Sequence, residues 1–248
     1  MDKKNLFSVI YKDSNILVVN KGSGLSVTQD RWDPEIPRLD TLLENEYGKV
    51  FTVHRIDKDT SGVVVYALNP DTHRFLSGEF EERRVEKTYI ALVYGSPEWQ
   101  EKKIEIKLKP DGDSLHRTVA DKKHGKYALT KCRVLASSRD FSWIEAKPVT
   151  GRTHQIRIHL KEEGFPIVCD SLYGNREGIY LSKLKKNWRG DIFEERPLLS
   201  RLGLHALKIS LKDPETGEKK TFTAPFPKDL EALRKQLEKV RGLDPVLP

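Results

Sequence analysis

The sequence predicts an α+β fold: a mixed, mostly antiparallel central sheet with flanking helices. Two observations lead to this prediction. Strand-like segments follow one another with few helix-like segments between them, and residues 103–109 alternate apolar with charged side chains. Alternation with a period of two indicates a strand that has one face in the core and the other in water. A doubly wound parallel sheet is disfavoured, because it needs a helix between most consecutive strands.

The elements expected in the first half of the chain follow from apolar runs and the turns between them. Strands are predicted at 7–11, 15–20, 51–53, 62–68 and 87–94, a loop at 22–37 and the start of a short helix at 39–43. Asn69 and Pro70 predict a helix from Pro70 to about Glu82, since Asn caps free N–H groups and Pro suits the first helical position. The buried stripe of this helix is predicted to contain Phe75, Leu76 and Phe80.

The second half of the chain is expected to be richer in strands. Further strands are predicted at 103–109, 127–135 and 141–146, and a hairpin at 204–211 and 220–223. Residues 153–163 are a predicted helix that ends at Gly164. Residues 229–241 carry apolar side chains at helical spacing, so they are a predicted surface helix with one buried face.

Composition indicates a globular protein with an anionic partner. The 248 residues are 37% hydrophobic and 33% charged, and 44 Lys and Arg against 37 Asp and Glu give a net charge of +7. Such a surplus favours nucleic acid as the partner. Cys132 and Cys169 form no CxxC pair, and we find neither a secretory leader nor a membrane-spanning apolar run. We therefore expect a cytoplasmic monomer with reduced thiols and no membrane association.

Chemically active side chains are densest between His54 and Gly62, in the sequence His-Arg-Ile-Asp-Lys-Asp-Thr-Ser-Gly. A charged turn between two apolar strands places side chains at a sheet edge, where sites are often built. Three other interpretations exist. The segment could be a solvated turn that caps the next strand, Asp57-Lys58-Asp59 could be a metal–nucleotide motif of a sugar-nucleotide transferase, or the two carboxylates could be a glycosidase pair.

The order of several motifs favours one interpretation. His54-Arg55-Ile56-Asp57 and Asp59-Thr60-Ser61-Gly62 resemble the His-Arg-Leu-Asp and Thr-Ser-Gly signature of RluA-type RNA pseudouridine synthases. Other stretches match that family in its own order across nearly the whole chain. They are Val18 to Lys21, Lys87 to Tyr89, Thr150 to Arg157 with the later Gly164, Pro166-Ile167, Asp170 and Tyr173-Gly174, and Leu204 to Ala206 with Thr216-Gly217 and Ala224-Pro225. Gly22 departs from the pattern, because the family usually has Pro there.

The resemblance implies an isomerase with the pseudouridine synthase fold that converts specific uridines of rRNA or tRNA to pseudouridine. It implies no cofactor and no metal, and structured RNA as the partner. We expect residues 1–248 to form a single catalytic domain without an S4 RNA-binding module. The alternative is an inactive RNA-binding or ribosome-assembly factor that has kept the fold.

The resemblance also implies roles for individual residues. Asp57 is the catalytic carboxylate, acting as a nucleophile on the ribose or as a base at C2′; the sequence does not choose between these routes. Tyr89 packs on the target base, and Arg55 helps to displace or replace it. Arg157 is our preferred ionic partner for Asp57, with Arg152 as the competitor. The expected RNA-phosphate contacts are Lys21, Lys87 and Arg152, and the expected supporting residues are His54, Thr60 and His205.

Overall fold

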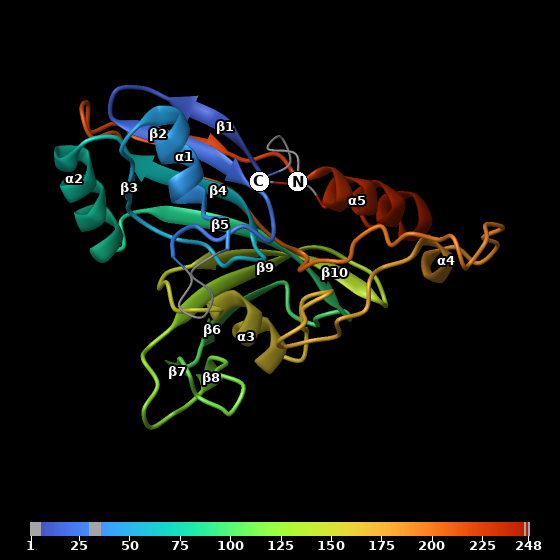
Figure 1. Ribbon diagram of the computed structural model, residues 1–248. Coiled ribbons are helices and arrows are strands. Elements are labelled where there is room, and N and C mark those ends of the chain that lie inside the picture. The colour runs from blue at the N-terminus through green and yellow to red at the C-terminus, as the bar shows by residue number, and fades with distance from the viewer. Residues whose placement is uncertain (1–5, 30–35, 246, 248) are drawn as a thin grey trace. The chain divides into compact units, whose positions relative to one another are not determined.

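The computed structural model describes residues 6–29, 36–245 and 247 (Figure 1). The chain divides into two compact units, each of which is formed by two separate stretches of sequence. Unit 1 contains the described residues up to Tyr89 together with His205–Pro225. Unit 2 contains Ile90–Leu204 and the described residues from Phe226 onward.

Unit 1 is built on a mixed sheet whose strands run in the order β1, β2, β4, β11, with β3 paired to β4 and β12 to β11. β4 pairs with β11 in parallel, whereas β1–β2, β2–β4, β3–β4 and β11–β12 are antiparallel pairs. The strands are β1 (Phe7–Lys12), β2 (Ile16–Lys21), β3 (Phe51–Thr52), β4 (Ser61–Ala67), β11 (Leu204–Lys212) and β12 (Lys219–Thr223). Every residue of β4 is buried, so this strand forms the centre of the unit's core.

Two helices accompany this sheet, α1 (Leu39–Tyr47) and α2 (Pro70–Glu81), and α2 contacts β3 and β4. The start of α2 is set locally, because the side chain of Asn69 accepts a hydrogen bond from the Thr72 N–H at 2.8 Å. Leu76 is fully buried on this helix, as predicted, but Phe75 is 36% exposed. The predicted burial of Phe75 is therefore wrong: the helix buries a narrower stripe than the apolar spacing suggested.

Unit 2 contains an antiparallel set of three strands, in which β9 (Leu129–Ser137) lies between β10 (Phe141–Pro148) and β6 (Glu101–Glu105). A small separate sheet pairs β7 (Leu108–Lys109) with β8 (Val119–Ala120). The residues of strand β5 (Glu86–Tyr94) are divided between the units: those up to Tyr89 belong to unit 1 and those from Ile90 to unit 2. The helices are α3 (Gln155–Glu162), α4 (Leu181–Leu184) and α5 (Lys228–Arg241), and α3 contacts β9 and β10.

The predicted fold class, a mixed and mostly antiparallel sheet with flanking helices, is confirmed. Most boundaries shift by one or a few residues, and two of the differences have a clear structural cause. The single strand expected at 103–109 is divided into β6 and β7, because Ile106 and Lys107 leave the β6–β9 pairing. The helix expected at 153–163 begins at Gln155, because His154 has the left-handed φ of 54°. Within the described residues, no helix is both long and apolar enough to cross a bilayer.

Candidate active site

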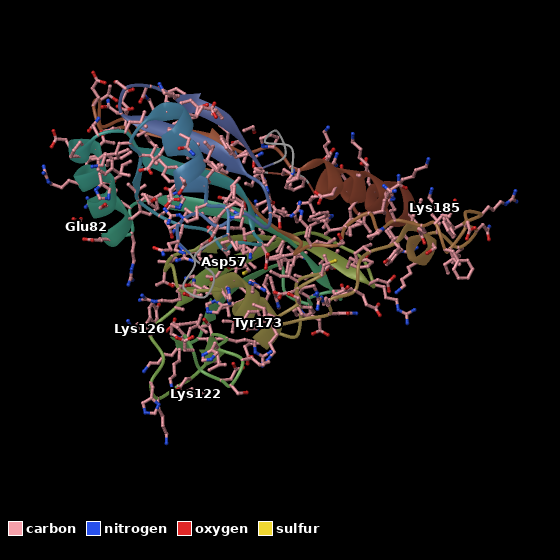
Figure 2. The ribbon with its side chains drawn as sticks, in the orientation of Figure 1. Asp57, Glu82, Lys122, Lys126, Tyr173 and Lys185 are labelled. Atoms are coloured by element: carbon pink, nitrogen blue, oxygen red, sulfur yellow. The ribbon has the colours of Figure 1, made fainter. Side chains whose placement is uncertain are left out.

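Asp57 lies on a tight turn that leads directly into the buried strand β4 (Figure 2). The Thr60 N–H donates a hydrogen bond to the Asp57 carbonyl at 3.1 Å, which closes the turn. Ile56 and Thr60 are 4% and 1% exposed, whereas Asp57 between them is half-buried. The flanking residues therefore anchor the turn in the core and leave Asp57 partly exposed.

The backbone of this turn is held from the side by the ammonium group of Lys21 at the end of β2. Its Nζ donates to the carbonyls of Gly22 at 2.9 Å, Leu25 at 2.7 Å and Lys58 at 2.9 Å. The Lys21 side chain is 0% exposed. The predicted role of Lys21 as an RNA-phosphate contact is therefore wrong, because a phosphate cannot reach an enclosed ammonium group. Lys21 instead connects the loop after β2 to the turn that carries Asp57.

The loop after β2 reinforces this connection. The Gly24 N–H donates to the Lys58 carbonyl at 2.8 Å, and the Ser23 hydroxyl donates to the Asp59 carbonyl at 2.6 Å. Gly24 has a left-handed φ of 84°, a conformation that favours glycine. The carbonyl groups of both central residues of the turn, Lys58 and Asp59, are thus bound by one loop.

The Thr-Ser-Gly part of the motif packs directly against β11. Gly62 has a φ of 121°, and a Cβ at this position would lie 2.2 Å from the backbone oxygen of Ala206. The Ser61 hydroxyl lies 2.9 Å from Nδ1 of His205, and Nε2 of His205 lies 3.0 Å from the Ala224 carbonyl. His205 is fully buried. The predicted supporting residue His205 therefore connects Ser61, at the start of β4, to Ala224, which directly follows β12.

His54 lies on the other side of Asp57 in sequence and faces β4. Its Nε2 accepts a hydrogen bond from the Val65 N–H at 3.0 Å, and its ring stacks on Phe80 with centroids 4.7 Å apart. Burial, together with the nearby positive charge of Lys87, lowers the pKa of His54 to about 3. His54 is therefore a neutral hydrogen-bond acceptor at physiological pH and is unsuited to act as an acid there.

Tyr89, Lys87 and Arg55 complete the group of predicted residues in unit 1. Burial raises the pKa of Tyr89, and the negative charge of Asp57 raises it further. Burial lowers the pKa of Lys87, whose Nζ lies 5.9 Å from the Phe80 ring centroid. Arg55 is exposed, as an RNA-contacting side chain must be.

Unit 2 contains Arg157, which is 1% exposed on α3. Its Nε donates to Asp170 Oδ2 at 2.8 Å and its Nη2 to Oδ1 at 2.7 Å, and its Cζ lies 5.1 Å from the ring centroid of Tyr173. Burial acts to raise the pKa of Asp170, but the hydrogen bonds and charge of Arg157 outweigh it, so the pKa lies below its usual value. Asp170 is thus an ionised partner that holds the guanidinium in one orientation.

The contacts of Asp170 and Tyr173 with Arg157 were not predicted from the sequence. The Tyr173 hydroxyl lies 2.8 Å from Nδ1 of His154 and accepts a hydrogen bond from the Thr118 N–H at 3.1 Å. Asp170 and Tyr173 occur in the segment matched to the family, so their positions were visible, but nothing in the sequence indicated that they contact Arg157. The contact depends on how the loop after α3 folds back on that helix.

Arg152, the competitor for the role of Arg157, is half-buried. Its Nε donates to the Tyr127 carbonyl at 3.1 Å, and its backbone N–H donates to Gln155 Oε1 at 3.0 Å. The side chain is therefore directed along unit 2's own backbone, while its partial exposure still permits contact with a phosphate.

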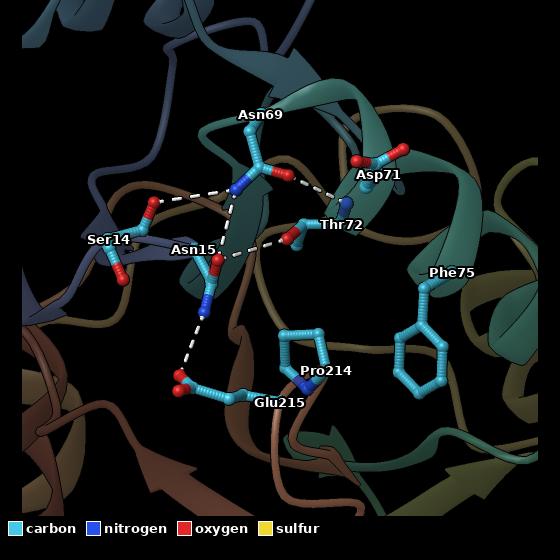
Figure 3. Close-up of a pocket in the computed structure, with 8 residues that line it drawn as sticks. All are labelled: Ser14, Asn15, Asn69, Asp71, Thr72, Phe75, Pro214 and Glu215. Carbon is cyan, nitrogen blue, oxygen red and sulfur yellow. Dashed lines mark hydrogen bonds between the residues drawn. The ribbon is translucent and has the colours of Figure 1, made fainter.

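A separate polar groove of about 470 Å³ opens in unit 1 beside the start of α2 (Figure 3). Asn15 donates to Glu215 at 3.3 Å and accepts from Asn69 at 3.0 Å, so its amide is used by neighbouring side chains. None of the predicted site residues lines this groove, and we assign no chemistry to it. Its lining consists of Ser14, Asn15, Asn69, Asp71, Thr72, Phe75, Pro214 and Glu215.

Comparisons with solved structures agree with this fold. The chain superposes on human RNA Pseudouridylate Synthase Domain Containing 4 with a TM-score of 0.71 and 22% identity, covering 96% of this chain and 94% of the human one. It superposes on human RNA Pseudouridylate Synthase Domain Containing 1 with a TM-score of 0.70 and 25% identity, covering 99% and 91% of the two chains. The architecture is thus that of a pseudouridylate synthase.

Sequence comparisons establish the family. Residues 15–162 match the family model described as RNA pseudouridylate synthase. The chain is 33% identical over 218 residues to the dual-specificity RNA pseudouridine synthase RluA of Escherichia coli K12, covering 88% of this chain and 92% of that protein. It is 35% identical over 231 residues to the ribosomal large subunit pseudouridine synthase D of Borreliella burgdorferi, but spans only 65% of that protein's length. The chain belongs to the RluA-type RNA pseudouridylate synthase family.

Proposed function

We propose that this protein isomerises uridine to pseudouridine in RNA, with Asp57 as the catalytic carboxylate. The observation that carries the proposal is the environment of Asp57: a half-buried carboxylate on a family motif, on a turn that Lys21 holds in place, whose charge raises the pKa of Tyr89. In the reaction the bond between uracil N1 and ribose C1′ breaks, the base turns, and C5 bonds to C1′. The proton leaves C5 and N1 gains one, so the reaction involves no net oxidation or reduction.

The remaining side chains have roles that fit their surroundings. Tyr89 packs on the extruded base, and exposed Arg55 occupies the space that the base leaves, because flipped bases are held by stacking and replaced in the helix. Lys87 and Arg152 contact phosphates. The role predicted for Arg157, as the ionic partner of Asp57, stays a prediction; within unit 2 its guanidinium is held by Asp170.

Ribosomal and transfer RNA are the proposed substrate classes. The ribosomal large subunit is named in the synthase D relatives, and the RluA relative is named as acting with dual specificity on RNA. The surplus of basic residues, which gives a net charge of +7, favours binding of a structured polyanion.

Tritium release from RNA containing 5-tritiated uridine tests this assignment. Asp57→Asn and Asp57→Ala should each lower the rate roughly a thousandfold or more, because they remove the group that acts at the sugar. RNA affinity, measured by filter binding, should remain within about threefold of the wild type. Asp59→Asn, in the same turn, is the matched control and should retain activity.

Three results would contradict the proposal. If Asp57→Ala still releases tritium at the wild-type rate, Asp57 is not catalytic. If the wild-type protein binds RNA tightly but isomerises no uridine in transcripts of either class, it is the inactive RNA-binding factor. If activity requires a divalent cation and Asp59→Asn abolishes it, the Asp57-Lys58-Asp59 metal motif is the better interpretation. We expect full activity in EDTA.

A further inference from the structure

A segment of unit 2 around α4 is closed at its base by backbone hydrogen bonds, and α4 also contacts α5. The Ile179 N–H donates to the Leu199 carbonyl at 2.8 Å, and the Leu198 N–H donates to the Ile179 carbonyl at 2.7 Å. The 18 residues between Ile179 and Leu198 include α4, which is anchored by Leu184 at 2% exposure. We call residues 185–193, which follow α4, the distal tip (Figure 2, where Lys185 is labelled).

The distal tip presents large apolar side chains to water. Phe193 is 95% exposed and the preceding Ile192 is 68% exposed. The turn that carries them is ordered by hydrogen bonds, since Asp191 Oδ1 accepts from the Phe193 N–H at 2.8 Å. The ring of Trp188 covers Gly190, where an added Cβ would lie 2.4 Å from it. Two large apolar side chains that an ordered turn exposes to water indicate a surface that contacts a partner.

Charge indicates which partner fits. The distal tip contains three basic side chains, of which Lys186 and Arg189 are exposed and Lys185 is half-buried. Its one acidic residue, Asp191, directs an oxygen at the tip's own backbone. Cations interleaved with an exposed aromatic ring match single-stranded nucleic acid, in which phosphates alternate with unstacked bases. A surface that binds a protein usually has few charged residues at its centre, unlike the distal tip.

We propose that the distal tip is an RNA-docking surface: Phe193 stacks on an unpaired base of the substrate while Lys186 and Arg189 contact the phosphates beside it. This inference rests on the proposed function, because it assigns RNA as the substrate. It extends that function by naming a surface, outside every motif of the family signature, that selects RNAs with an unpaired nucleotide.

Two variants separate stacking from charge. Phe193→Ser should weaken binding to unmodified large-subunit rRNA transcripts roughly tenfold and leave the salt dependence unchanged, because it removes a stacking contact. The double variant Lys186→Glu/Arg189→Glu should weaken binding and reduce the slope of log K against log salt by about 2. Its matched control is Lys12→Glu/Lys212→Glu, which makes the same charge change at two exposed lysines of unit 1. In both tip variants KM should rise while kcat at saturating RNA is retained.

A photo-crosslinking amino acid at position 193 identifies the occupant directly. Crosslinks to rRNA or tRNA transcripts support the inference. Crosslinks only to a second copy of this chain or only to protein from a ribosome preparation overturn it, as do tip variants whose RNA affinity equals that of the matched control. Crosslinking and binding are also measured on Asp57→Asn protein and need no turnover. RNA crosslinks without any isomerisation would therefore contradict the proposed function alone, and isomerisation without a tip effect would contradict this inference alone.

Discussion

Arg157 and Asp170 form a buried, two-bond ion pair in which Nε donates at 2.8 Å and Nη2 at 2.7 Å, and both side chains are 1% exposed. Asp170 also accepts from the backbone N–H groups of Leu172 and Tyr173 at 2.9 and 3.1 Å. The orientation of Arg157 is therefore set by a carboxylate that is itself oriented by backbone. A proposed catalytic role for Arg157 depends on this pairing.

Asp170→Asn should destabilise the protein by about 3–5 kcal/mol in urea unfolding, because the buried guanidinium loses its ionic partner. Arg157→Met/Asp170→Leu should recover much of this stability, since no uncompensated charge remains, yet it should lose activity. Glu162→Gln, which breaks the exposed pair with Lys161, serves as the control and should cost less than about 1 kcal/mol. A loss as small as the control's for Asp170→Asn would show that the buried pair does not hold Arg157.

Gly62→Ala should destabilise the protein by about 3 kcal/mol or more, or prevent folding. The new Cβ would lie 2.2 Å from the Ala206 oxygen, and the residue would have to keep a φ of 121°. Gly78→Ala is the matched control, because Gly78 lies within α2 and a Cβ there meets nothing within 4 Å. This control should stabilise the protein by roughly 0.5–1 kcal/mol. Equal unfolding midpoints for the two variants would rule out the close approach of β4 to β11.

Lys21→Met should lower kcat and thermal stability while leaving the salt dependence of RNA binding unchanged. The reason is that Nζ of Lys21 donates to three backbone carbonyls, one of them in the Asp57 turn, and is enclosed. Filter binding across a salt series checks this, with Arg55→Met as the comparison at an exposed cation. If the slope of log K against log salt falls by about 1 in Lys21→Met, Lys21 contacts a phosphate after all, and the burial argument is wrong.

His54 should make the protein sensitive to mild acid. Its pKa is about 3 when folded and near 6.5 when unfolded, so unfolding takes up roughly one additional proton between these values. The stability that neutral His54 contributes is complete above pH 6.5 and is lost progressively as the pH falls toward 3. His54→Gln keeps an acceptor for the Val65 N–H and should reduce this loss. Urea midpoints of both proteins measured from pH 7.5 to 4 should converge with falling pH, and a constant difference would contradict the assignment.

The local elements were the part of the fold that sequence predicted well. Asn69 and Pro70 define the start of α2, and the leucines of α5 at 230, 233 and 237 are buried as their spacing indicates. These features depend on residues a few positions apart, so the information lies within a short window. The weaker predictions, such as the division of 103–109 into β6 and β7, concern edges where long-range pairing decides where a strand ends.

The sequence by itself determined the order of strands and helices, the family and the segment that carries Asp57, because each depends on residues that are close together in the sequence. The tertiary structure alone decided which partners the predicted residues contact. The enclosed ammonium group of Lys21 binds backbone carbonyls instead of a phosphate. His205 contacts Ser61, which lies 144 positions away in the sequence, and Arg157 pairs with Asp170. The physical reason is that burial and hydrogen-bond partners are set by chain segments brought together on folding, and no local pattern records which segments these are.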